Sequence, residues 1–236
     1  MAIFQFKAFA VRQDKAAMKV GTDGVLLGAW APLENAPETV LDVGAGTGLV
    51  ALMMAQRSGA SVIDAVEIEP GAFEECVHNF EESPWADRLF CYHSAFEAFS
   101  EEMEEPYELI LSNPPFYEAA VDSSHPNRDM ARQQNSLPPQ TLLAGVIRLL
   151  DPQGTFCLIL PLGQEEPFRA MAEDMGLFPY RITRVKGNPH APIKRSLLAF
   201  SFNRITPVEE LLVLEKARHQ YTPEYLELVR DFYLKL

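Results

Sequence analysis

Cysteine is scarce in this chain, and the few that occur show no pairing pattern. Cys76, Cys91 and Cys157 are odd in number and widely spaced, whereas disulfide frameworks and zinc sites need paired or closely spaced cysteines. Long apolar runs are also missing, since no stretch approaches the roughly 18 apolar residues that a membrane span needs. The first ten residues include Gln5 and Lys7, unlike a secretory signal. These absences predict a cytoplasmic protein with no membrane partner and no metal centre.

Positive charge is in short supply as well, because 33 acidic residues against 20 Lys and Arg give a formal net charge of −13. Over the whole chain, that balance argues against a nucleic-acid partner. The charges are unevenly spread, however. Residues 64–108 hold fourteen acids and one base, whereas residues 179–204 hold six bases and no acid. This asymmetry indicates either an ordinary solvated surface or one face that binds a polyanion.

The 236 residues, 47% of them apolar, suit one large α/β domain. Short β-branched or aliphatic runs predict buried strands, and they alternate with segments of helical periodicity. A later pair of strand-like runs flanks a Gly-Asn-Pro turn, as in an antiparallel hairpin. The expected strands are 39–43, 61–67, 89–93, 107–111, 154–160, 180–186 and 196–202; the expected helices include 70–82, 97–105, 137–150, 165–175 and one that begins at Pro223.

A glycine-rich turn, Asp42-Val43-Gly44-Ala45-Gly46-Thr47-Gly48, joins the strand 39–43 to a helix. This is the opening of a nucleotide-binding βαβ unit. Leu49 stands where a dinucleotide fingerprint has its third glycine, so a compact adenosyl ligand fits better than a pyrophosphate. Glu67 ends the next strand, and a carboxylate there can accept hydrogen bonds from both hydroxyls of a ribose. The alternative is a solvated glutamate at a strand end.

The strand 107–111 leads into Ser112-Asn113-Pro114-Pro115-Phe116-Tyr117, where we place the chemistry. Prolines lack an N–H and fix φ, so the loop is stiff and presents carbonyl acceptors. The Asn113 side-chain oxygen and the Pro114 carbonyl can each accept one hydrogen of an amino group. Phe116 or Tyr117 offers a flat face for a ring. The alternative is a proline-fixed loop whose aromatic side chain packs into the core.

Two further turns have both a structural and a functional interpretation. In Gly21-Thr22-Asp23-Gly24, Thr22 or Asp23 is the N-cap of the apolar helix that follows; alternatively, this turn faces a ligand. In Ser94-Ala95-Phe96, which follows the strand 89–93, an adenine ring can pack on Phe96. His93 is expected to be a partnered structural residue rather than a base.

Two parts of the chain are candidates for contact with a polyanion. The polar segment 118–140, which carries Arg128 and Arg132, is too long for a tight turn. It is either a recognition segment or a mobile surface loop. The other part is the expected hairpin, whose candidate contact residues are Arg184, Lys186, Lys194 and Arg195.

With these motifs in chain order, the sequence resembles the class I S-adenosylmethionine-dependent methyltransferases that methylate amino groups. Further stretches look like the bacterial tRNA1(Val) adenine-37 N6-methyltransferases. These stretches are Arg12-Gln13-Asp14, residues 18–30, Tyr221-Thr222-Pro223-Glu224-Tyr225 and Asp231-Phe232-Tyr233-Leu234. The resemblance covers nearly the whole chain.

The resemblance implies a Rossmann-like class I methyltransferase fold: a seven-stranded, mostly parallel sheet with an antiparallel last strand and helices on both faces. Residues 1–38 would pack on the fold and line the cofactor site, and residues 39–236 would form the methyltransferase domain. The cofactor would be S-adenosyl-L-methionine. The substrate would be N6 of adenine 37, next to the anticodon of valine tRNA, and we expect a monomer.

The resemblance also assigns roles by position. Around the cofactor, Thr22 and Asp23 would lie near its methionine end, Asp42, Gly44, Gly46 and Gly48 would line it, Glu67 would hold its ribose, and Ala95 and Phe96 would flank its adenine. Asn113 and Pro114 would hold the target amine, Phe116 would stack on the target ring, and Tyr117 is a second candidate for that stacking.

Several rival functions remain open on the sequence. A protein methyltransferase that acts on a glutamine amide would use the same Asn-Pro-Pro-aromatic loop, and so would an enzyme acting on ribosomal RNA. A non-catalytic cofactor- or RNA-binding module has no need for two converging acceptors beside a cofactor. A dehydrogenase is disfavoured by Leu49.

Overall fold

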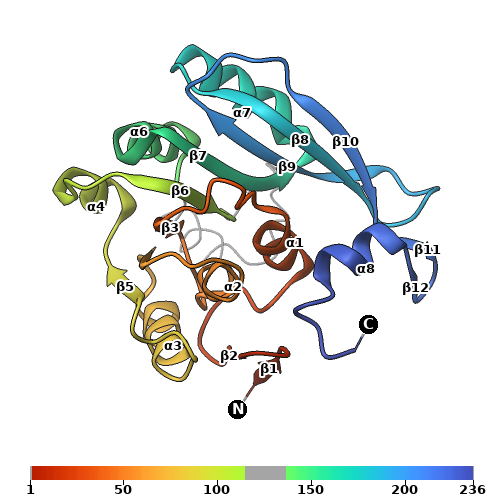
Figure 1. Ribbon diagram of the computed structural model, residues 1–236, viewed down its shortest axis with the longest axis horizontal. Coiled ribbons are helices and arrows are strands. Elements are labelled where there is room, and N and C mark those ends of the chain that lie inside the picture. Colours follow the sequence, from red (N-terminus) through yellow and green to blue (C-terminus); the bar gives the residue numbers. More distant parts are fainter. Residues whose placement is uncertain (1, 115–136, 236) are drawn as a thin grey trace, which may run out of the picture.

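The fold is described from a computed structural model, which describes residues 2–114 and 137–235 (Figure 1). Within these residues, eight strands form one sheet in the order β10-β8-β9-β7-β6-β3-β4-β5. β9 runs antiparallel to both of its neighbours, and the other pairings in this sheet are parallel. The strands are β3 (Thr39–Val43), β4 (Val62–Glu67), β5 (Leu89–His93), β6 (Tyr107–Ser112), β7 (Leu150–Pro161), β8 (Phe178–Lys186), β9 (Ile193–Ser201) and β10 (Val208–Val213).

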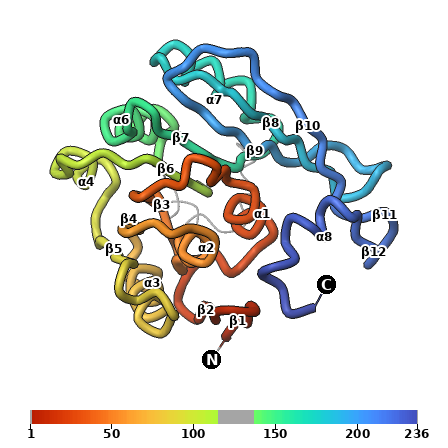
Figure 2. The backbone as a smooth tube through the Cα atoms, viewed as in Figure 1, coloured from red at the N-terminus to blue at the C-terminus, as the bar shows by residue number. Residues whose placement is uncertain are grey.

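Helices cover both faces of this sheet (Figure 2). α1 (Thr22–Trp30), α2 (Leu49–Arg57), α3 (Pro70–Glu81) and α8 (Pro223–Val229) contribute to one apolar core. α4 (Phe96–Glu102), α6 (Pro139–Leu149) and α7 (Leu162–Asp174) contribute to the other. Successive strand residues alternate between the two cores, since Val40 lies in the first and Leu41 in the second. Both faces are therefore buried, which explains why the strands are continuous apolar runs.

The predicted Rossmann-like α/β fold is confirmed, with one correction to the number of strands. Seven strands were expected, and seven of the eight match that expectation, including the antiparallel β9, which comes last among them in the chain. The additional strand is β10, which pairs in parallel with β8 at the edge of the sheet. Its sequence, Val-Glu-Glu-Leu-Leu-Val, buries only Leu212, so it carries little of the apolar signal by which a strand is predicted.

The N-terminal segment packs on the domain through buried polar side chains. It forms a hairpin of β1 (Ile3–Gln5) and β2 (Ala10–Arg12). The buried Glu75 carboxylate of α3 accepts hydrogen bonds from three successive backbone N–H groups, those of residues 14, 15 and 16, at 2.5, 2.7 and 2.8 Å. Asn79, one turn further along α3, pairs with the Arg12 backbone and donates to the Thr47 carbonyl at 2.9 Å. α3 thus joins this segment to the glycine-rich turn.

The two predicted helix caps have different outcomes. Thr222 caps α8 as expected: its hydroxyl accepts from the Tyr225 N–H at 3.2 Å, and Pro223 is the first helical residue. The predicted capping of α1 by Thr22 or Asp23 is wrong. α1 begins at Thr22, its N-cap is Gly21, and no side chain caps it. The Asp23 carboxylate instead pairs with Arg195 of β9.

Two short strands, β11 (Glu215–Ala217) and β12 (Gln220–Tyr221), form a hairpin just before α8. A single bridge between Phe6 and Tyr233 brings the two ends of the chain together. In residues 2–114 and 137–235, no helix combines the length and the apolar character that crossing a membrane would require.

We predict that Glu75→Ala lowers the free energy of unfolding by about 2 kcal/mol or more. The substitution leaves three backbone N–H groups without their acceptor, and each buried unsatisfied donor costs about 1–3 kcal/mol. Urea denaturation measures the change. Glu74→Ala is the matched control, because the Glu74 carboxylate is exposed and pairs with the also exposed Lys15; it should leave the free energy of unfolding nearly unchanged. Equal effects of the two substitutions would contradict this account.

Candidate active site

The candidate site lies along the edge of the sheet where β3, β4, β5 and β6 end. These four strands are neighbours and run parallel. Their carboxyl ends therefore meet at one edge, which is where open α/β sheets bind ligands. The structure thus brings together four predicted features: the glycine-rich turn after β3, Glu67 at the end of β4, Ala95 after β5 and Asn113 after β6.

The glycine-rich turn needs its glycines for two different reasons. Gly44, Gly46 and Gly48 have φ values of 71°, 58° and 78°, in the left-handed region that disfavours side chains. A Cβ at Gly48 would lie 2.5 Å from Phe80, so this glycine lets α2 pack closely on α3. A Cβ at Gly44 or Gly46 would meet no heavy atom within 4 Å. These two glycines therefore leave open space in front of the turn, as an adenosyl cofactor requires.

Glu67 holds the shape of this turn. The residue is only 8% exposed. Its carboxylate Oε2 accepts from the Gly46 N–H at 2.8 Å, and Oε1 accepts from the Glu69 N–H at 2.8 Å. Each oxygen has a second lone-pair position, so these bonds leave room for two ribose hydroxyls. The predicted ribose ligand is thus also a part of the turn.

Asp42 supports the turn from beneath instead of lining its open side, where it was predicted. Its side chain is 1% exposed and accepts from the Ala51 N–H, in the first turn of α2, at 3.1 Å. The N-cap of α2 is Gly48, which has no side chain, so Asp42 provides the cap from the neighbouring strand. Burial raises the pKa of Asp42 to about 7, the Ala51 hydrogen bond opposes this shift, and the charge of Glu67 adds to it.

We predict that Asp42 makes the stability of the protein fall as the pH rises from about 4 to 7. With its pKa raised, the folded chain binds the proton more tightly than the unfolded chain. The stabilisation is therefore complete below the unfolded value and is lost as the pH passes through the folded one. Relative to Asp42→Asn, the wild type should lose at most roughly 1.4 kcal/mol per pH unit across this window. Urea denaturation at a series of pH values measures the difference, and a constant difference would contradict the assignment.

The end of β6 places Asn113 beside the N-terminus of α1. The buried Ser112 hydroxyl donates to the Val43 carbonyl at 2.9 Å, which fixes the end of β6 against the start of the glycine-rich turn. A Cβ on Gly24 would lie 3.8 Å from Asn113 Nδ2, an ordinary contact distance, so the Asn113 side chain lies against the first turn of α1. Asn113 is partly exposed and Pro114 is buried. Phe116, Tyr117, Arg128 and Arg132 lie outside the described residues.

The predicted packing of adenine on Phe96 is wrong. The Phe96 ring is 6% exposed and lies in the core between α4 and α6, where a Cβ on Gly145 would come within 2.4 Å of it. α4 begins at Phe96 with the exposed Ala95 as its N-cap. At this position, the groups available to contact an adenine are the Ala95–Phe96 backbone and the small Ala95 side chain.

Sequence reasoning missed Ile68 as a candidate apolar contact. It follows Glu67 directly and is 43% exposed. An isoleucine placed just after a strand-end acid is the signal that could have found it. Its carbonyl lies 3.1 Å from His93 Nε2, and the His93 ring stacks on Phe73 with centroids 4.8 Å apart. His93 is thus a partnered structural residue, as predicted.

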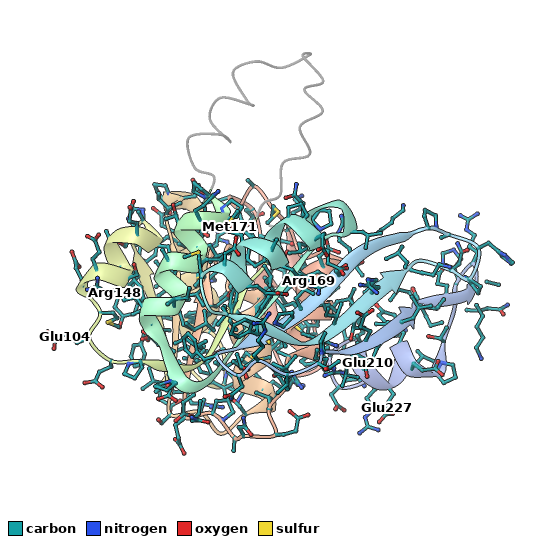
Figure 3. The ribbon with its side chains drawn as sticks, turned by 90° about the horizontal axis from the view of Figure 1, so that it is seen from above. Glu104, Arg148, Arg169, Met171, Glu210 and Glu227 are labelled. Atoms are coloured by element: carbon teal, nitrogen blue, oxygen red, sulfur yellow. The ribbon has the colours of Figure 1, made fainter. Side chains whose placement is uncertain are left out.

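The two hairpin arginines predicted to meet a polyanion, Arg184 and Arg195, already have partners within the protein. Arg184 pairs with Glu165 at 2.5 Å and with Glu209 at 2.7 Å. Arg195 pairs with Asp23 at 2.7 Å. The same pattern holds for Arg181 and Glu210, which is labelled on β10 in Figure 3. The acids come from α1, α7 and β10, so a count of charges along residues 179–204 could not find them.

The lysines of the hairpin differ from these arginines. Lys194 is exposed. Within the described residues, Lys186 pairs with no acid and donates to the Pro189 carbonyl at 3.1 Å. Both lie near the turn that joins β8 to β9, where β8 reaches its carboxyl end. They remain candidates for contact with a polyanion.

The donor groups of the site suit an organic cofactor. Across the described parts of the chain, no three His, Cys, Asp or Glu side chains gather so that they could hold a metal ion. Three features meet at this edge of the sheet: the open space in front of Gly44 and Gly46, the Glu67 carboxylate, and the start of the Asn-Pro loop after β6. Together with the order of its strands, this site defines a class I methyltransferase.

Comparison with known proteins gives the same class and a family. The model of the methyltransferase small domain matches residues 24–155. The tRNA1(Val) (adenine(37)-N6)-methyltransferase of Flavobacterium johnsoniae is 52% identical, over 99% of this chain and 100% of that protein. The protein of the same name from Christiangramia forsetii is 54% identical, over 99% and 98%. The chain therefore belongs to the tRNA1(Val) (adenine(37)-N6)-methyltransferase family, and it is an S-adenosylmethionine-dependent enzyme.

Solved structures that resemble this one are distant in sequence and support the fold. A predicted O-methyltransferase, protein Atu636 of Agrobacterium tumefaciens, is 16% identical with a TM-score of 0.69, over 89% of this chain and 96% of that one. P. horikoshii TYW2 in complex with MeSAdo is 13% identical with a TM-score of 0.56, over 84% and 69%.

We predict that Gly46→Ala raises the Kd for S-adenosylmethionine at least about tenfold. The added Cβ projects into the open space before the turn, where the cofactor is expected to lie. Its cost of roughly 1–2 kcal/mol at this left-handed φ also favours a shifted turn, which no longer fits the cofactor. A tenfold change corresponds to about 1.4 kcal/mol. Titration calorimetry measures the Kd. Gly163→Ala is the matched control, because a Cβ there also meets nothing within 4 Å but φ is not positive. An unchanged Kd for Gly46→Ala in a folded protein would contradict the site.

Proposed function

We propose that this protein transfers a methyl group from S-adenosylmethionine to N6 of adenine 37, next to the anticodon of tRNA1(Val). The observation that carries the proposal is the position of Asn113 and Pro114, at the end of β6 beside the glycine-rich turn. The relatives that carry this reaction in their name match the chain over almost its full length, which supports the same substrate here.

The residues at the edge of the sheet would hold the cofactor as follows. The open faces of Gly44 and Gly46 would admit it, Glu67 would accept from its ribose hydroxyls, and the Ala95–Phe96 backbone would meet its adenine. The turn at Thr22 and Asp23 would lie toward its methionine end. When bound, S-adenosylmethionine supplies an electrophilic methyl group on a sulfonium.

The target amine needs help, because its lone pair is delocalised into the adenine ring. The Asn113 side-chain oxygen and the Pro114 carbonyl accept one N–H hydrogen each. Two such acceptors favour a pyramidal nitrogen whose lone pair points away from the loop. Positioning and electrostatics then supply most of the acceleration. A strong base is unnecessary before the attack, because the methylated nitrogen becomes acidic and loses its proton late.

The anticodon loop suits such a site because its bases are unpaired. Taking an unpaired base out of its stack costs less than the few kcal/mol needed to extrude a paired one. Lys186 and Lys194 would meet the RNA backbone, together with Arg128 and Arg132, while Phe116 or Tyr117 would stack on the target ring. The proposal places the protein in the cytoplasm with its tRNA, acting as a monomer.

The experiment that tests this function supplies labelled S-adenosylmethionine together with separate pools of tRNA, ribosomal RNA and protein. We expect label in the tRNA pool, recovered as N6-methyladenosine after digestion to nucleosides. A tRNA1(Val) transcript in which guanine replaces adenine 37 is the control, and it should take up no label. Label in protein would favour the glutamine methyltransferase instead, and label in ribosomal RNA would favour another RNA substrate.

We predict that Asn113→Ala lowers kcat about 100-fold or more, whereas the Kd for S-adenosylmethionine stays within about twofold. The magnitude follows from the loss of one preorganised hydrogen-bonding group at a reaction centre, which costs about 100- to 1,000-fold. Steady-state methylation at saturating tRNA measures kcat, and single-turnover methylation shows that the loss lies in the chemical step. Asn203→Ala is the matched control, because Asn203 is exposed on a turn after β9. Methyl transfer at the normal rate by Asn113→Ala would show that the reacting amine lies elsewhere.

A further inference from the structure

A cleft of about 470 Å³ lies apart from the glycine-rich turn, between the two ends of the chain and the hairpin of β8 and β9. Its walls come from segments that are distant in the sequence. The aromatic lining consists of Phe4 from the N-terminal hairpin and Tyr221, Tyr225 and Tyr233 from the C-terminal region. Thr22, Asn188, Lys235 and the acidic Glu215 add polar groups. Apart from Thr22, which would lie toward the methionine end of the cofactor, the residues that line this cleft have no role assigned above.

Part of the cleft's wall lies at the carboxyl ends of the strands, as the candidate active site does: Gly187 and Asn188 follow β8, and Leu214 follows β10. β8 and β10 run in the direction of β7, because β9 is antiparallel to both of its neighbours and β10 is parallel to β8. Asn188 follows the carboxyl end of β8. The Glu215 N–H donates to the Gly187 carbonyl at 3.0 Å, which ties this turn to the C-terminal segment.

α1 links the cleft to the Asn-Pro loop. Thr22, the first residue of α1, lines the cleft. A Cβ added to Gly24, two residues later, would lie 3.8 Å from Asn113 Nδ2. A substrate held at Asn113 therefore has the cleft next to it, on the other side of the first turn of α1.

The lining suits a flat, unsaturated ring with polar edges. The Tyr221 and Tyr225 rings have centroids 5.3 Å apart, and Tyr225 is only 4% exposed, which makes it a fixed wall. Tyr233 packs edge-on against Phe4. Asn188 Oδ1 already accepts from two backbone N–H groups, so its amide NH2 is left to donate. Aromatic rings stack on nucleobases, and a lysine at the rim can meet a phosphate.

We propose that this cleft binds a nucleobase that neighbours the methylated adenine in the RNA substrate. The inference rests on the proposed function and adds the part of the substrate that the cleft recognises. A base in a single-stranded loop can be splayed out and stacked on aromatic side chains, as is usual in sequence-specific RNA recognition. Phe4, Tyr221 and Tyr233 are the partly exposed rings of the cleft. Of these, Tyr221 lies against the buried Tyr225, and it is the residue we expect to stack on this base.

The test uses the full-length protein and anticodon stem-loop RNAs of tRNA1(Val) in which each nucleotide flanking the target adenine is made abasic in turn. For the wild type, one abasic position should raise KM for the RNA about tenfold and leave kcat nearly unchanged, as expected for one stacked base. Tyr221→Leu should lose the same factor on intact RNA and nothing more on that abasic RNA. Tyr221→Phe should bind intact RNA as the wild type does. Tyr92→Leu is the matched control, because Tyr92 lies on β5, the outermost strand on the side of the sheet away from β8 and β10; it should leave KM for the RNA unchanged.

Several outcomes would overturn the inference. In one, no abasic position changes KM for the wild type, a result that does not depend on whether any variant folds. In another, the increases in KM caused by Tyr221→Leu and by the abasic site multiply in full, which would show that the Tyr221 ring does not contact that base. Dissociation of a dimer by Tyr221→Leu in sedimentation would make the cleft an interface between copies of the chain. Failure of the wild type to methylate any of these RNAs would instead contradict the proposed function.

Discussion

The hydrogen bond from the Gly46 N–H to the Glu67 carboxylate is the interaction on which the site depends. It joins the turn after β3 to the end of β4, so two strands determine the shape of one backbone loop. Two left-handed glycines then keep the space in front of that loop open. Beneath it, Asp42 satisfies the first turn of α2 from a buried position. One carboxylate is thus placed to meet a ligand, and the other is placed to hold the fold.

A second set of contacts fixes the parts of the chain that are remote in sequence around this loop. α3 holds the N-terminal segment through Glu75 and Asn79, and Asn79 also contacts the glycine-rich turn. Asp23 of α1 pairs with Arg195 of β9, which ties the hairpin to the helix that approaches Asn113. The strongly acidic composition is therefore partly accounted for by internal pairs. At the hairpin turn, Lys194 is exposed and Lys186 is partly exposed, and neither pairs with an acid among the described residues.

The sequence predicted the elements whose signal is local. The glycine-rich turn, the acid at the end of β4, the Asn-Pro loop and the Thr222 cap each depend on a few adjacent residues, and the described parts of each lie where they were expected. It could not predict features that depend on partners from elsewhere in the chain. The Phe96 ring looked available for adenine until α6 was placed against it. Arg184 looked free because its acids come from α7 and β10. The edge strand β10 escaped notice because it buries only Leu212.

The central claim is that the Asn113 side chain and the Pro114 carbonyl hold the adenine amine next to the cofactor. A crystal structure with S-adenosylhomocysteine and the anticodon stem-loop of tRNA1(Val) tests it most directly. The account predicts that adenine 37 is turned out of its stack, with its N6 about 3 Å from both Asn113 Oδ1 and the Pro114 oxygen. An adenine bound away from these two oxygens, or a cofactor that lies away from Gly44 and Gly46, would contradict it.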